Sequence, residues 1–115
     1  MTRFLVLSCL ALGACGPEPP LREGDAERGR LLLRQYGCVS CHRIHGVAGK
    51  PGDVGPPLDG IARRVYLAGV LPNTPENMAR WIRNPQEYEP RTVMPDMQVG
   101  EDQARDMVAY LYTLK

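Results

Sequence analysis

The chain has 115 residues and a formal net charge of +1 at neutral pH. This length suits a single small domain, and the near-neutral charge gives no indication of nucleic-acid binding. Aromatic residues make up only 6% of the chain, which also carries 12 glycines and 11 prolines. We therefore expect a loop-rich fold with a thin core of its own.

Residues 1–14 have the pattern of a secretory signal peptide. Arg3 precedes an apolar run over residues 4–12 that is too short to span a bilayer comfortably. The run leads into Leu-Gly-Ala-Cys15, which resembles the lipobox of bacterial lipoproteins. We expect lipidation of Cys15, which would anchor the protein on the periplasmic side of a bacterial membrane. The alternative is an ordinary signal peptidase site, which would leave no lipid.

Residues 15–24 are expected to carry that lipid and to act as a tether. Pro17, Pro19 and Pro20 favour an extended, polyproline-like path. A disordered N-terminus is the alternative, and it is compatible with a tether. The domain proper is expected over residues 25–115.

Residues 25–36 are predicted to form the first helix. Asp25 can act as its N-cap, and Glu27 suits the positive end of a helix. Leu32 and Tyr36 share one face, together with Gly29 and Leu33 at three- and four-residue steps. A glycine inside a helix costs stability unless another segment approaches closely there.

The helix is followed by Cys38-Val39-Ser40-Cys41-His42, a C-x-x-C-H motif. This is the attachment motif of a c-type haem, in which two thiols add to the porphyrin vinyl groups and the histidine binds iron. On a helical turn all three side chains project from one face. A redox dithiol and half of a zinc site are the alternatives for a bare C-x-x-C pair.

The four cysteines can be accounted for without a disulfide. Cys9 would leave with the signal peptide, Cys15 would carry lipid, and Cys38 and Cys41 would carry haem. The haem would also supply the apolar mass that the chain lacks, so we expect the chain without haem to fold poorly.

A glycine-rich loop is expected over residues 43–57, followed by a short helix from Leu58 to Val65. His45 stands too close to His42 to reach the opposite face of a haem, and we expect it to face solvent. Thr74-Pro75-Glu76 is a good helix start, and this helix should end before Pro85.

Residues 85–100 are expected to be irregular, and they contain Met94 and Met97. A final helix is predicted from Glu101. It has an apolar stripe of Ala104, Met107, Val108, Leu111 and Leu114. We expect no strand and no internal repeat.

From Asp25 to Lys115 the chain resembles a monohaem class I cytochrome c of bacterial respiratory chains. The proximal matches are C-x-x-C-H after a helix containing Gly29, and Gly55-Pro56 with Leu58. The distal matches are Asn84-Pro85, Tyr88, Pro90, Thr92 and Met94, followed by Ala109-Tyr110-Leu111 in the last helix.

The resemblance implies an all-α class I cytochrome c fold wrapped round one covalent haem c. His42 and Met94 would be the axial ligands, and the Pro56 carbonyl would accept a hydrogen bond from His42. Leu58, Trp81 and Thr92 would also contact the haem. Both methionines of the irregular segment could reach iron from outside a helix, and the resemblance favours Met94 over Met97.

The function implied is electron transfer at the membrane surface rather than catalysis, since no acid–base pair is evident near the motif. The partners would be a donor and an acceptor redox protein, with the carrier a monomer. Two alternatives stay open. One is a fixed subunit of an oxidase or quinol-oxidising complex, and the other is a haem enzyme or small-molecule sensor with a displaceable sixth ligand.

Two departures from the family pattern bear on the distal side. Arg91 stands where the family often has glycine, and it could alter the turn or place a charge at the haem rim. Trp81 stands where mitochondrial relatives carry a tyrosine, and an indole can donate but not accept a hydrogen bond. We also expect Gly29 to face Met107 and Tyr110 where the first and last helices cross.

Overall fold

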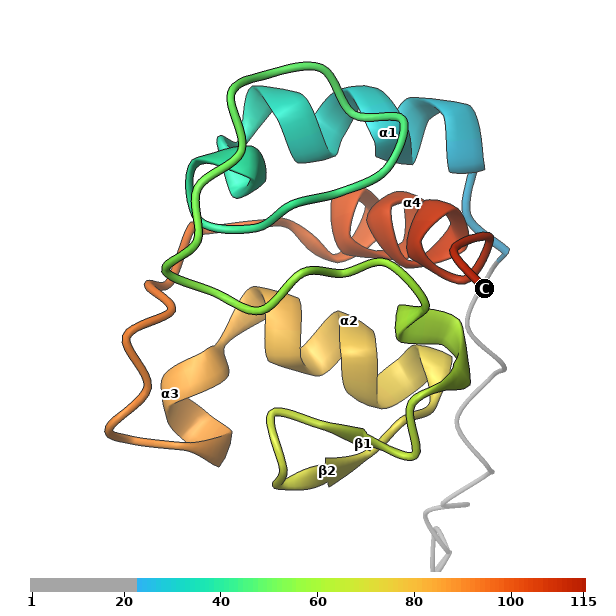
Figure 1. Ribbon diagram of the computed structural model, residues 1–115. Helices are drawn as coiled ribbons and strands as arrows, with labels where there is room; N and C mark the ends of the chain where they lie inside the picture. The colour runs from blue at the N-terminus through green and yellow to red at the C-terminus, as the bar shows by residue number, and fades with distance from the viewer. Residues whose placement is uncertain (1–22) are drawn as a thin grey trace, which may run out of the picture.

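The computed structural model describes residues 23–115. The predicted signal peptide, Cys15 and nearly all of the tether lie outside these residues. The helices are α1 (Ala26–Gln35), α2 (Pro75–Arg83), α3 (Pro85–Tyr88) and α4 (Glu101–Leu111), with short 3-10 turns at Cys38–Ser40 and Ile61–Arg63 (Figure 1). Within residues 23–115, none of the helices has the length and apolarity that crossing a bilayer requires.

Helices α1 and α4 cross in close contact. A Cβ built on Gly29 would lie 1.8 Å from the Asp106 carbonyl oxygen and 2.9 Å from the Met107 nitrogen. The predicted close approach is therefore present, and it involves backbone rather than side chains. The hydroxyl of Tyr110 reaches the loop after the C-x-x-C-H motif: it would lie 2.3 Å from a Cβ at Gly46, and it donates to the His45 carbonyl at 2.6 Å.

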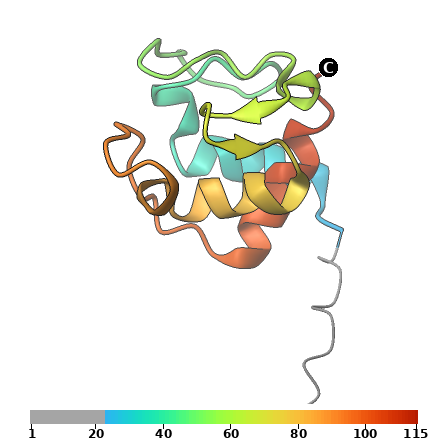
Figure 2. The same cartoon turned by 90° about the horizontal axis from the view of Figure 1, so that it is seen from below.

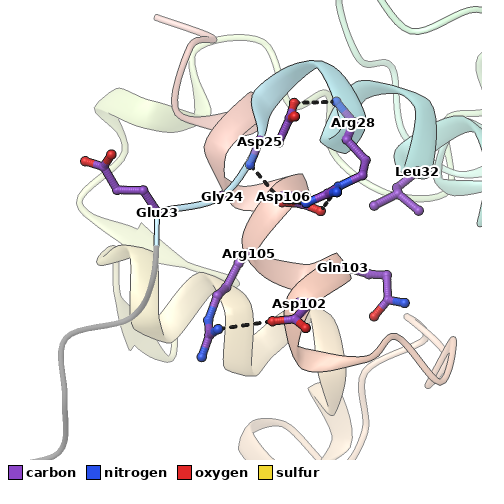
Figure 3. Close-up of a pocket in the computed structure, with 9 residues that line it drawn as sticks. All are labelled: Glu23, Gly24, Asp25, Arg28, Leu32, Asp102, Gln103, Arg105 and Asp106. Atoms are coloured by element: carbon purple, nitrogen blue, oxygen red, sulfur yellow. Dashed lines mark hydrogen bonds and ion pairs between the residues drawn. The ribbon is translucent and has the colours of Figure 1, made fainter.

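A buried carboxylate fastens the start of α1 to α4 (Figure 3). Asp106 is 4% exposed and accepts hydrogen bonds from the Asp25 backbone nitrogen at 2.7 Å and from Arg28 Nε at 2.5 Å. The bond to Asp106 also raises the pKa of Arg28. A cavity of about 790 Å³ opens beside this junction. The cavity belongs to the helix crossing and includes none of the C-x-x-C-H side chains.

The core forms where α2 and α1 pack on the apolar stripe of α4. Every residue of the predicted stripe is buried, and Met78 and Ile82 of α2 are buried against it. The ends of the helices follow the predicted caps. Asp25 Oδ1 accepts from the Arg28 nitrogen at 2.9 Å, and Thr74 Oγ1 accepts from the Asn77 nitrogen at 3.1 Å.

Three local expectations were wrong. A small antiparallel hairpin pairs β1 (Tyr66–Leu67) with β2 (Leu71–Pro72), because Ala68 and Gly69 both adopt positive φ and close a tight turn. The helix expected over residues 58–65 shrinks to the turn at Ile61–Arg63. Residues 85–100 are not wholly irregular, since Pro85 starts α3 at a first-turn position that suits proline.

Candidate haem site

The C-x-x-C-H segment leaves α1 through Gly37, whose φ of +75° falls in the left-handed region that favours glycine. The His42 nitrogen then bonds to the Cys38 carbonyl at 3.0 Å, four residues back. This is the bond of a helical turn, and side chains three and four apart project from the same side of such a turn. Cys38 and Cys41 are both free, half-buried thiols.

Burial sets the chemistry of the first thiol. Desolvation raises the pKa of Cys38, so the thiol stays protonated at neutral pH. A protonated thiol is a weak nucleophile for disulfide exchange, which disfavours the redox dithiol interpretation. Residues 23–115 hold no group of three or more His, Cys, Asp or Glu side chains placed to bind a metal ion.

The ring of His42 is fixed by the loop that follows it. Its Nδ1 lies 2.7 Å from the Pro56 carbonyl oxygen, as the resemblance implied. With Nδ1 donating to that carbonyl, Nε2 is left to bind a metal. A Cβ on Gly55 would lie 2.3 Å from Cε1 of the ring, so only glycine leaves room for it there.

Backbone bonds hold this proximal loop against the motif. Gly52 donates to the Val39 carbonyl at 2.9 Å, and Gly55 donates to the Cys41 carbonyl at 2.8 Å. Leu58, which is half-buried, donates to the Arg43 carbonyl at 2.9 Å. Each bond joins the loop to a residue of the motif or next to it, so the position of the His42 ring is specified by contacts remote in sequence.

Met94 lies in the segment after α3 and is half-buried. Its carbonyl accepts a hydrogen bond from Gln86 Nε2 at 2.7 Å, and its nitrogen donates to Thr92 Oγ1 at 3.2 Å. Met97 is 37% exposed and Val93 is 80% exposed. Met94 is thus the less exposed of the two methionines in this segment.

The two departures from the family pattern have different outcomes. The side chain of Arg91 is 93% exposed and lies 3.7 Å from Glu89, while the Arg91 nitrogen bonds to the same carboxylate at 3.1 Å. A side-chain acceptor therefore supports the turn where glycine is often found. Trp81 is half-buried on α2, one position before the buried Ile82.

Sequence reasoning missed two contributors to this region. Gln86 anchors the Met94 backbone, but nothing in its sequence context marks it for that role. Gly52 packs on the motif, and a Cβ there would lie 1.9 Å from the Ser40 carbonyl oxygen. Its place in a glycine-rich loop gave no indication which glycine makes the close approach. His45 is exposed, as expected, and stays outside the group.

Residues 26–115 match the cytochrome c family. The chain belongs to that family, whose members hold one covalent haem c through the C-x-x-C-H motif. The haem fits the residues present here, which are His42 held by the Pro56 carbonyl, the thiols of Cys38 and Cys41, and Gly55 beside the His42 ring. The protein is thus a class I c-type cytochrome, all-α apart from its short hairpin, and its cytochrome c domain indicates haem-based electron transfer.

The chain is also similar to part of the sequence of curated proteins. The chain is 33% identical over 91 residues to cytochrome c oxidase subunit 2 of Alkalihalophilus pseudofirmus, covering 78% of this chain and 26% of that protein. It is 26% identical over 102 residues to subunit 2 from a Bacillus species, covering 85% and 28%. The chain therefore spans about a quarter of the length of these curated relatives.

Solved structures share the fold. SoxXA from P. pantotrophus is similar with a TM-score of 0.63 and 25% identity, over 82% of this chain and 84% of that chain. Cytochrome c2 from Rhodobacter sphaeroides has a TM-score of 0.61 and 23% identity, over 80% and 97%.

Proposed function

We propose that this protein is an electron carrier with His42 and Met94 as axial ligands, held by lipid on the periplasmic side of a bacterial membrane. The observation that carries the proposal is the fixed ring of His42, with Nδ1 bonded to Pro56 and Nε2 left for iron. The family match supports the haem, and the half-buried position of Met94 supports the second ligand.

The bound haem supplies a one-electron couple between ferrous and ferric iron. Cys38 and Cys41 would hold it by thioether bonds, and the Pro56 carbonyl would orient His42. A thioether ligand from Met94 favours the ferrous state and raises the reduction potential. With both axial positions filled by the chain, the remaining tasks of the protein are to exclude water and to present the haem edge to partners.

Carbon monoxide tests the carrier against the enzyme or sensor alternative. A reduced carrier with both axial positions filled should not bind carbon monoxide at neutral pH, and it should exchange electrons rapidly with an inorganic redox couple. Ready binding of carbon monoxide by the wild-type protein would favour the enzyme or sensor instead.

The lipid anchor is supported by the Leu-Gly-Ala-Cys15 pattern and the proline-rich stretch that follows. Lipoprotein maturation adds several acyl chains, and more than one chain is needed for stable membrane binding. Cys15→Ser should move the haem protein from the membrane fraction to the soluble fraction. Cys9→Ser, which alters only the predicted signal peptide, is the matched control and should leave the protein on the membrane.

A second candidate role is a subunit of an oxidase. It is favoured by the curated relatives, which are subunit 2 of cytochrome c oxidases. Affinity purification of the protein from detergent-solubilised native membranes distinguishes the two roles. A fixed subunit should bring stoichiometric oxidase subunits through high salt, whereas a free carrier should elute alone.

A further inference from the structure

The β1–β2 hairpin presents an apolar surface to solvent. Val65 is 74% exposed, Tyr66 is 58% exposed and Val70 is 40% exposed. Residues 65–72 contain no charged side chain, although charged residues make up 23% of the chain. We call residues 65–72 the apolar hairpin.

The strand register explains which side chains point outward. Tyr66 pairs with Pro72, and Leu67 pairs with Leu71. Cross-strand partners share a face, and Leu67 is only 4% exposed, so Leu67 and Leu71 form the inner face. Tyr66 and Pro72 form the outer one. A surface hairpin of this kind normally has a polar outer face.

Hydrogen bonds at the base keep the hairpin in this position. Asn73 Nδ2 donates to the Ile61 and Arg64 carbonyls, each at 2.8 Å. Asn73 Oδ1 accepts from the Tyr112 hydroxyl at 2.7 Å, and the Asn73 nitrogen donates to the Val65 carbonyl at 2.9 Å. These bonds thus fix the position of the hairpin, and exposed apolar patches commonly mark interaction surfaces.

The first residues that the structure describes lie near the base of the apolar hairpin. Glu23 and Gly24 line a cavity of about 370 Å³ together with Pro75, at the start of α2, and Tyr112. Pro75 lies three residues after the end of β2. In Figures 1 and 2, α2 and the hairpin lie next to each other, and Figure 1 shows α1 on the opposite side of α4 from them.

Chain length limits how far Cys15 can be from this place. Eight backbone steps, each from one residue to the next, join Cys15 to Glu23 in the sequence. At a maximum of about 3.6 Å per residue, they span no more than about 29 Å. A membrane that holds Cys15 is therefore within about 29 Å of Glu23.

We propose that the apolar hairpin rests on the phospholipid bilayer to which Cys15 is attached, an inference that depends on the lipid anchor proposed above. Tyr66 suits the headgroup region, where amphipathic rings concentrate. Val65 and Val70 would enter the acyl boundary, and the absence of charge over residues 65–72 means that no ion is desolvated there. Because the tether makes this contact intramolecular, a weak affinity is sufficient.

A spin label measures the contact directly. In the mature holoprotein, Cys15 would carry lipid and the other two cysteines haem, so a cysteine introduced at Ala68 would be the only free thiol. The lipidated holoprotein of full sequence is reconstituted in protein-free vesicles of phosphatidylethanolamine with a minority of phosphatidylglycerol. The label on Ala68→Cys should collide several-fold less with water-soluble chromium oxalate than it does in solution, and more with oxygen. Leu31→Cys, on α1 and 53% exposed, is the control and should remain accessible to chromium oxalate.

Paired variants give a second measurement. Tyr66→Ser with Val70→Ser should remove the protection of the Ala68 label, while Leu31→Ser should preserve it. Equal exposure of both labels to chromium oxalate on vesicles that retain the protein would overturn the proposal. Protection seen only in native membranes, and not in protein-free vesicles, would also overturn it and indicate a protein partner.

The lipid-anchor proposal can be tested separately from the hairpin contact. Mass spectrometry of the mature N-terminus shows whether Cys15 carries acyl chains. If it carries none, the anchor proposal is wrong. The same labels are then measured in a Cys15→Ser background, which removes the unlipidated thiol, with the protein held on the vesicles by an N-terminal histidine tag and a nickel-chelating lipid. Protection of the Ala68 label there supports the hairpin contact, and its absence rejects the contact.

Discussion

The two sides of the proposed haem site are built differently. On the proximal side, the ring of His42 is bonded to a carbonyl 14 residues away, and the loop around it is joined to the motif by several backbone hydrogen bonds. On the distal side, Met94 is held through Thr92, two residues away, and Gln86, eight residues away. The neighbouring Val93 is 80% exposed.

This difference separates the roles of the two proposed ligands. A ligand fixed by contacts remote in sequence moves only if the fold itself opens, whereas one held by local bonds can move when its own segment opens. We therefore expect His42 to be the permanent ligand and Met94 to be the one that is lost first under stress. Gly55→Ala alters the proximal side and Gln86→Leu alters the distal side. Gly29→Val alters the α1–α4 crossing, which is the scaffold that both sides share.

The largest effect is expected from the shared scaffold. Gly29→Val would place side-chain atoms against the α4 backbone, where a Cβ alone would lie 1.8 Å from the Asp106 carbonyl oxygen. We expect a loss of about 3 kcal/mol in the free energy of unfolding, measured by thermal or denaturant unfolding of the holoprotein. Leu31→Val, at an exposed site of the same helix, controls for β-branching and should cost only about 0.5 kcal/mol. Equal melting temperatures for Gly29→Val and wild type would place the crossing elsewhere.

A smaller effect, confined to the proximal side, is expected from Gly55→Ala. The added methyl would lie 2.3 Å from the ring of His42 and would push the ring away. The hydrogen bond between His42 Nδ1 and the Pro56 carbonyl would then be lost. We expect a destabilisation of about 2 kcal/mol, with a shifted Soret band that reports altered histidine ligation. Val54→Ala changes the exposed neighbour and should leave the spectrum unchanged. An unaltered spectrum in Gly55→Ala would mean that the ring tolerates crowding and that the proximal side is less rigid than described.

The smallest effect is expected from Gln86→Leu on the distal side. This change removes the hydrogen bond to the Met94 carbonyl at a cost of about 1 kcal/mol. The methionine-bound form should then be lost at a lower denaturant concentration, while global unfolding changes little. The exposed neighbour substitution Glu87→Leu is the control. If Gln86→Leu shifted the loss of methionine binding and global unfolding to lower denaturant by the same amount, the distal segment would not open independently.

The helices could be predicted from the sequence because their determinants are local. Asp25 and Thr74 cap their own helices, and the stripe on α4 depends only on spacing along one element. The hairpin could not be predicted, because its turn requires Ala68 in a left-handed conformation that the residue type does not favour. The buried contact of Asp106 with Asp25 joins residues 81 apart, and no local pattern encodes it.

The haem site could likewise be predicted from the sequence only where its determinants are local. The spacing of Cys38, Cys41 and His42 indicates haem attachment without any structure. The bond from His42 to Pro56 followed only from the family resemblance, since nothing local relates residues 14 apart. The choice between Met94 and Met97 also came from the resemblance, and it stays a prediction.

The near-infrared absorption of the ferric protein tests the central claim most directly. Methionine-bound ferric haem has a weak band there, and the account predicts this band in wild type and in Met97→Ala. Met94→Ala should abolish the band, lower the reduction potential and open the reduced iron to carbon monoxide. A band that survives in Met94→Ala and disappears in Met97→Ala would contradict the ligand assignment, and a wild-type protein without the band would contradict the carrier itself.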